Sequence, residues 1–172
     1  MIILDSDIVS STSDKLRYCE GIEIRRDGLV IDGRGHRIDA MTNGRIFKIK
    51  DKTVTFKNIT FTHGISLPRN QSFEAVFNST IGGGAVYAAG CRISFINCKF
   101  EENVNNRGSA IFLGYSQTVI EDCEFINNNA SEFGGAIFND DDSTLTVINS
   151  KFQDNTGLLK INLAYHTVPC GI

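Results

Sequence analysis

One short phrase recurs three times along this chain at almost fixed spacing. It reads GGGAVY, GSAIF and GGAIF, and its alanines, Ala85, Ala110 and Ala136, lie 25 and 26 residues apart. A second phrase, x-N-x-x-F, occurs four times, as FKNITF, FINCKF, IEDCEF and VINSKF. Its last three copies keep a step of 25 and 27 residues, whereas the first gap is 39 residues. Self-similarity at such a period is typical of solenoids, in which each unit buries its apolar side against the next.

Each repeat has the pattern of short strands. GAIFN, TLTVIN and SKFQ are β-branched or aromatic runs separated by Gly, Asn, Asp and Ser. The intervals offer no apolar period of 3.6 residues that is long enough for a helix. Three strands and three turns in about 25 residues make one coil of a parallel β-solenoid, with coils about 4.8 Å apart. We therefore predict an all-β chain, a single-stranded parallel β-helix of about five coils, roughly 24 Å long.

The repeat also divides the chain. Residues 1–20 are expected to form a partial N-terminal cap or first strand, and residues 21–157 the stacked coils. The long first gap predicts a loop inserted at 65–81. Residues 158–172 are apolar and start a coil without a polar cap, so we interpret them as an incomplete C-terminal coil or tail. Because exposed terminal coils need caps, we expect end-to-end self-association and a piece of a larger repeat protein.

The recurrent side chains form columns, one residue per coil. We expect Gly to turn the corner before each Ala, and the Ala and the next aliphatic residue to point to opposite sides of the strand. A stack of aromatic rings is predicted inside the core from Phe61, Phe100, Phe125 and Phe152. An amide ladder along one corner is predicted from Asn58, Asn97, Asp122 and Asn149. A second Asn column, for the next corner, is predicted from Asn103, Asn128 and Asn155.

Composition excludes several classes of function. A formal charge of −3 and scattered Lys and Arg do not make a nucleic-acid-binding face. No apolar run reaches about 18 residues, so we expect no membrane span. The five cysteines include no CxxC pair, so neither a zinc ribbon nor a redox pair is indicated, and no cofactor is expected. Cys98 and Cys123 are equivalent in two repeats, and their predicted spacing exceeds disulfide geometry, so we predict free thiols.

Few residues suggest catalysis. A lyase or glycosidase needs carboxylates gathered on one face across adjacent coils, and Glu101 and Glu124 do not share a column. His36 and His63 stand in Gly-rich turns, where we expect turn residues rather than general bases. The triple carboxylate run is interpreted as a solvated turn, with a weak Ca²⁺ site as the alternative. Its residues are Asp140, Asp141 and Asp142.

The stretch GLVIDGRGHRIDA, followed by GRIFKIKDKTVTFKNITFTHG and the GGAI and F-x-x-N coils, resembles a known family. It is similar to the adhesin-like surface proteins of methanogenic archaea, and its repeats also resemble those of chlamydial polymorphic outer-membrane proteins. The resemblance covers residues 21–155 and implies a right-handed parallel β-helix at the cell surface or secreted. The first residues lack the basic and apolar stretches of a secretory signal.

Two hypotheses of function follow. The resemblance implies a non-catalytic adhesin-like module whose partner is a surface polysaccharide or a protein on another cell. The alternative is a carbohydrate-active enzyme, a polysaccharide lyase or glycosidase, because pectin-lyase-like enzymes share the architecture. For a binding module the inserted loop is the expected contact. Its candidate binding residues are Arg69, Asn70, Phe73 and Phe77.

Overall fold

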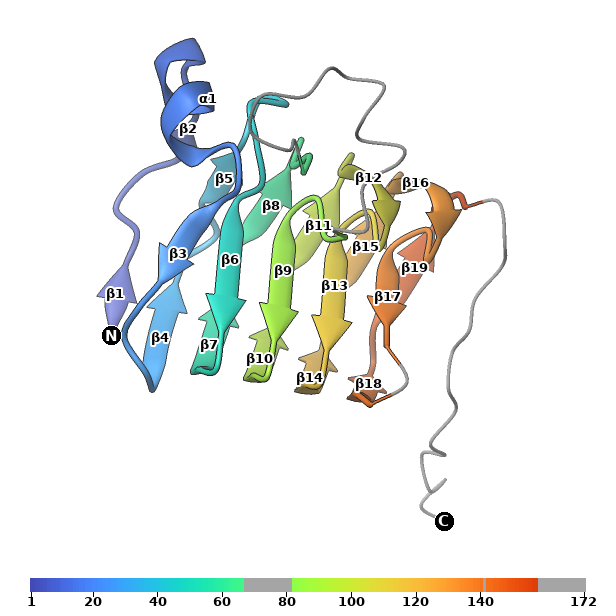
Figure 1. Cartoon of the computed structure of the whole chain (residues 1–172). Coiled ribbons are helices and arrows are strands. Elements are labelled where there is room, and N and C mark those ends of the chain that lie inside the picture. The colour runs from blue at the N-terminus through green and yellow to red at the C-terminus, as the bar shows by residue number, and fades with distance from the viewer. Residues whose placement is uncertain (67–81, 141, 158–172) are drawn as a thin grey trace.

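The computed structural model of the chain describes residues 1–66, 82–140 and 142–157 (Figure 1). Its strands form three long parallel sheets, named A, B and C here. Sheet A contains β1 (Ile2–Ile3), β4 (Leu29–Asp32), β7 (Thr53–Lys57), β10 (Arg92–Ile96), β14 (Gln117–Glu121) and β18 (Thr144–Ile148). Sheet B contains β2 (Ile8–Val9), β5 (Arg37–Asp39), β8 (Thr60–Thr62), β11 (Lys99–Glu101), β15 (Glu124–Ile126) and β19 (Lys151–Gln153). Sheet C contains β3 (Ile22–Ile24), β6 (Phe47–Lys50), β9 (Val86–Ala89), β13 (Ile111–Gly114) and β17 (Ile137–Asn139).

The chain visits the three sheets in turn, so one circuit makes one coil. Every strand pairs in parallel with its equivalent in the neighbouring coil, and Figure 1 shows the coils side by side along one axis. About five coils of roughly 26 residues result, which confirms the predicted parallel β-solenoid. A fourth, two-stranded sheet, D, forms at the corner between sheets B and C from β12 (Val104–Arg107) and β16 (Asn129–Phe133).

The one helix of the described chain is α1 (Thr12–Tyr18), which lies between β2 and β3. The Asp14 carboxylate accepts hydrogen bonds from Ser11 N (2.8 Å) and Ser11 Oγ (2.7 Å), which is the acidic half of a capping box. The sequence analysis missed this helix, although Ser11-x-x-Asp14 was its signal.

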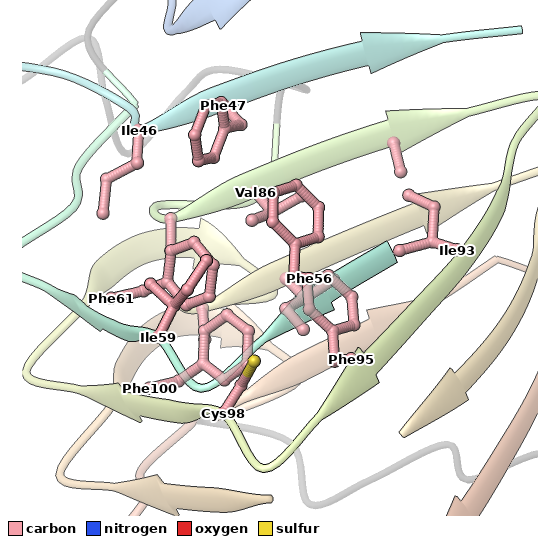
Figure 2. Close-up of a cluster of buried hydrophobic side chains, with 14 of the residues drawn as sticks. Ile46, Phe47, Phe56, Ile59, Phe61, Val86, Ile93, Phe95, Cys98 and Phe100 are labelled. Carbon is pink, nitrogen blue, oxygen red and sulfur yellow. The ribbon is translucent and has the colours of Figure 1, made fainter. Parts of the chain in front are cut away.

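The core is a set of inward-facing columns that run along the solenoid axis (Figure 2). Phe61, Phe100, Phe125 and Phe152 stack with ring centroids 4.7 Å apart and planes within 11° of parallel. A parallel stack that the sequence analysis did not single out joins Phe56 and Phe95 at 5.2 Å. The two stacks meet edge to face, as Phe95 and Phe100 do at 81°. Both arrangements are favourable for aromatic quadrupoles.

The expectation that each Ala and the next aliphatic residue face opposite sides is wrong. Ala85 and Val86 are both fully buried, and so are Ala110 and Ile111. The strands begin only at Val86 and Ile111, so each Ala lies in the bend before the strand, where strict alternation does not apply. Strand alternation places the following aromatic residues outside, where Tyr87, Phe112 and Phe138 stack at 5.3 Å.

The glycine that turns this corner stands two residues before the alanine. Gly108 has φ +56°, and a Cβ there would lie 2.1 Å from the carbonyl oxygen of Ile111. Gly83 and Gly134 hold the same place in their coils, with φ of +80° and +66°. Glycine adopts this conformation with the least strain, so the coil geometry explains the glycine that recurs two residues before each alanine.

Candidate functional site

A groove of about 680 Å³ runs along the corner between sheets A and B, across several coils. Its wall is formed by the turn after sheet A and by the first residues of the sheet B strands. The lining residues are Arg34, Gly35, Asn58, Ile59, Thr60, Asn97, Cys98, Lys99, Asp122 and Glu124.

The corner itself is made by four residues in the left-handed conformation. Asn58, Asn97, Asp122 and Asn149 have φ between 46° and 53°. Asn and Asp are several-fold enriched in this region of backbone space, which gives the column its composition. The sharp turn exposes the side chains of Asn97 and Asp122 to solvent, so the column can present polar groups to a ligand.

Side-chain hydrogen bonds join only the N-terminal part of this column. Asn97 Nδ2 donates to Asn58 Oδ1 (2.8 Å), and Asn58 Nδ2 donates to Asp32 Oδ1 (2.9 Å). The hydrogen bond from Asn58 is the main cause that lowers the pKa of Asp32. Asp122 carries a carboxylate, which cannot donate to Asn97 when ionised. The sequence analysis missed Asp32, because it lies at the end of β4 and its own coil lacks the x-N-x-x-F phrase.

Charged side chains line the sheet B side of the groove. Lys99 and Glu124 are register partners on β11 and β15, and Lys99 Nζ also pairs with Glu101. The hydrogen bond to Glu101 raises the pKa of Lys99, so its ammonium group stays charged. Glu101 pairs with Ile126 rather than with Glu124, which confirms that the two glutamates occupy different columns.

Two carboxylates are among the residues that line the groove. Asp122 and Glu124 belong to one coil, and both are exposed. Together with Arg34 and Lys99, they give the groove two cations and two anions beside its amides, which is a hydrogen-bonding surface of balanced charge.

Cysteine and serine side chains form the buried edge of this corner. Cys98 N donates to Cys123 Sγ (3.4 Å), and Cys123 N donates to Ser150 Oγ (3.0 Å). The described cysteines are free thiols, which confirms the prediction for Cys98 and Cys123. Contact with Cys123, together with burial, raises the pKa of the Cys98 thiol, so it is a poor nucleophile. The sequence analysis treated this column as small or apolar, yet it also completes backbone hydrogen bonds.

The next corner contains an amide ladder whose first two members, Asn103 and Asn128, are buried. Asn128 Oδ1 accepts from Asn103 N (3.1 Å) and Asn103 Nδ2 (2.9 Å). Asn128 Nδ2 donates to Phe100 O (3.0 Å) and to Asn155 Oδ1 (2.8 Å). Asn103 and Asn128 are 0% exposed. In the F-x-x-N phrase, each Asn donates to the carbonyl of the Phe in the preceding coil, and the buried Asn103 and Asn128 are out of reach of a ligand.

His63 lies at this same corner between two carboxylates. Its Nδ1 is 2.9 Å from Asp39 Oδ1, and its Nε2 is 2.8 Å from Glu102 Oε2. Its φ of 53° recurs in Glu102 and Asn127, the equivalent residues of the next coils. The left-handed backbone is thus a property of this corner in successive coils, as expected for a turn residue. The imidazole of His63 links three coils, because Asp39 and Glu102 belong to the coils on either side. His36, the other turn histidine, is 3.1 Å from Asp7.

The linkage through His63 predicts a pH-dependent contribution to stability. Partial burial lowers the pKa of His63, but the hydrogen bonds with Asp39 and Glu102 outweigh this effect and leave it raised. The ion pairs therefore stabilise the folded state fully below about pH 6.5, the ordinary pKa of histidine. This stabilisation is lost as the pH rises through the higher pKa that His63 has in the folded state. We expect His63→Gln to lower the free energy of unfolding at pH 5.5 by up to about 1 kcal/mol, because water screens the pair. Urea titrations at pH 5.5 and pH 8.5 should show a smaller difference at pH 8.5; an equal difference at both values would contradict the ion pair.

A buried arginine connects the two sides of the inserted segment. Arg45, 3% exposed, donates to Ser66 Oγ (2.6 Å) before the insertion and to Gly82 O (3.0 Å) and Gly83 O (2.8 Å) after it. Burial lowers the pKa of this guanidinium to about 10, so it remains charged at neutral pH. The sequence analysis missed this role, because nothing local to Arg45 indicates a contact nearly 40 residues away.

The predicted loop residues lie outside the described part of the chain. They are Arg69, Asn70, Phe73 and Phe77. Ile65, the first residue of the predicted insertion, still belongs to the coil, since it forms a parallel bridge with Val104.

The acidic run begins in a turn. Ser143 N donates to Asp140 O (2.8 Å), Asp142 is exposed, and Asp141 is not among the described residues. In the described ranges no three His, Cys, Asp or Glu side chains come together as a metal site. Nor does the described chain contain a helix with the length and apolar character needed to cross a bilayer.

Comparison with known proteins agrees with this architecture. The family model described as "Right handed beta helix region" matches residues 8–167. No curated protein and no solved structure matches the chain. The coils stack in parallel register, and the family match covers most of the length of the chain. The chain therefore belongs to the right-handed beta-helix family.

Proposed function

We propose that this protein is a non-catalytic, adhesin-like binding module that acts at a cell surface and holds an extended polysaccharide in the corner groove. The observation that carries the proposal is the groove itself, which continues across coils and presents equivalent polar groups once per coil. The resemblance of the leading coil and the repeats to archaeal adhesin-like proteins and chlamydial polymorphic outer-membrane proteins supports the surface role.

The shape and chemistry of the groove favour a linear polymer. Successive coils are about 4.8 Å apart, which is close to the length of one sugar ring in an extended chain. The amides of Asn58 and Asn97 are one coil apart and can donate to or accept from hydroxyl groups. Since Arg34 and Lys99 are balanced by Asp122 and Glu124, we expect a hydroxyl-rich polysaccharide with few charges rather than a polyanion.

The enzyme alternative receives less support. A polysaccharide lyase or glycosidase on this fold would gather carboxylates from several coils. The groove holds two carboxylates among its lining residues, both from one coil. Its cysteine is a protonated thiol, and His36, which follows the lining residue Gly35 in the sequence, pairs with Asp7.

A substitution that fills the groove tests this proposal. Thr60 lines the groove at the start of β8, and Thr60→Trp is expected to lower affinity for a retained polysaccharide at least tenfold, about 1.4 kcal/mol. Binding would be measured by affinity electrophoresis with soluble linear glucans, mannans and galactans, and with polygalacturonate as the acidic comparison.

The matched control is Thr55→Trp, on β7 in the same coil. Thr55 lies on the outer face of sheet A, away from the groove residues. This variant should bind as the unmodified chain does. Equal binding by both variants would place the ligand elsewhere, and preferential retention of polygalacturonate would contradict the charge argument.

A further inference from the structure

The first and last coils that the structure describes expose the ends of the same inward-facing columns. On sheet B, Ile8 is the first member and Phe152 the last of the column that contains the stacked phenylalanines. Ile8 is 43% and Phe152 48% exposed, whereas Phe61, Phe100 and Phe125 between them are fully buried. Large apolar side chains of the core thus reach solvent at both ends.

The other two sheets show the same relation. On sheet A the column through Phe56 and Phe95 begins at Ile2, which is 47% exposed, and ends at Val147. On sheet C, Ile22, 42% exposed, begins the column that ends at Ile137. Helix α1 leaves Ile2, Ile8 and Ile22 uncovered. Each end also presents three edge strands whose outer backbone groups pair with no described strand.

From this register we infer that the C-terminal end of one copy of this chain docks on the N-terminal end of a second copy, head to tail. Such stacking continues each column across the junction, with Phe152 against Ile8, Val147 against Ile2 and Ile137 against Ile22. The three edge strands β17, β18 and β19 then meet β3, β1 and β2 in the parallel order of every other coil.

Charge on the outer face favours this polarity. Lys99, Glu124 and Lys151 alternate in sign along one outer column of sheet B. At the other end of this column the carboxylate of Asp7 lies beside Arg37 and is 46% exposed. Head-to-tail docking in this register brings the ammonium group of Lys151 next to the carboxylate of Asp7, its opposite charge. Because the contact is heterologous, it adds copies without closing.

Blocking one end at a time tests the polarity. Ile8→Lys blocks the N-terminal end, and Phe152→Lys blocks the C-terminal end. Both positions are already about half exposed, so the variants should fold, which circular dichroism would verify. In sedimentation velocity we expect the unmodified chain to form a concentration-dependent series of oligomers, and each variant alone to be monomeric.

The decisive sample is an equimolar mixture of the two variants. In this mixture the Ile8→Lys variant has an open C-terminal end and the Phe152→Lys variant has an open N-terminal end. Head-to-tail docking therefore predicts dimers of the two variants and nothing larger. The control Ile148→Lys, on the outer face of the last coil, should behave as the unmodified chain does. A monomeric unmodified chain would show that residues 158–172 or another segment covers the end, and would overturn the inference. Dimers of the Ile8→Lys variant alone would indicate tail-to-tail docking and overturn it as well. Glycan binding is measured separately, so either outcome leaves the proposed function intact.

Discussion

Replacing Phe100 with alanine is expected to lower the free energy of unfolding by about 3–5 kcal/mol. Phe100 is fully buried and stacks between Phe61 and Phe125 at 4.7 Å on each side. It also meets Phe95 edge to face at 5.3 Å. The coils on both sides are fixed by backbone pairing, so they cannot collapse into the space that the ring leaves. The loss therefore includes a cavity as well as the burial of one aromatic side chain.

The matched control is Phe152→Ala in the same column. Phe152 contacts one ring, Phe125, and is 48% exposed. Removal of the Phe152 ring should lower the free energy of unfolding by less than half as much as removal of the Phe100 ring. Urea titration of both variants gives the comparison, and similar losses at the two positions would contradict the role of stacking inside the column.

Replacing Asn128 with alanine is expected to destabilise the protein by about 2–5 kcal/mol. Its side chain supplies the partners of two buried backbone groups, the N–H of Asn103 and the carbonyl of Phe100. Alanine leaves both groups without these partners at a corner where the side chains of Asn103 and Asn128 are 0% exposed. Each unpaired buried group costs about 1–3 kcal/mol.

Asn97→Gly provides the comparison for this ladder. Asn97 belongs to the outer column, is exposed and has φ 50°, a conformation that glycine tolerates. We expect this change to cost less than about 1 kcal/mol, because water replaces the lost amide contact. If Asn128→Ala were as mild as Asn97→Gly in thermal or urea unfolding, the buried column would not have the structural role described.

The sequence predicts the fold well because each recurrent residue meets the same requirement in every coil. The 25-residue step of Ala85 and Ala110 appears in the structure as strand register, with Val86 opposite Ile111. The difference between the two asparagine columns could not be predicted. Asn97 and Asn128 have the same residue type and period, and only the three-dimensional bend exposes one and buries the other.

The sequence repeat could not predict contacts between residues that are not equivalent in successive coils. The Asp39–His63–Glu102 linkage joins three different residue types from three coils. Arg45 reaches across the insertion to Gly82 and Gly83. Neither recurs, so self-similarity gives no signal for them. The groove is likewise a product of the corner geometry, since its residues come in short groups from successive coils.

We expect the groove to bind a polysaccharide and to leave it intact. The most direct measurement is the chain-length distribution of a polysaccharide retained by the protein, determined by size-exclusion chromatography after prolonged incubation. We predict an unchanged distribution and no new reducing or unsaturated ends, with retention lost in Thr60→Trp. Shortened chains whose formation is abolished by Asp122→Asn or Glu124→Gln would contradict a binding module and identify the groove as an active site.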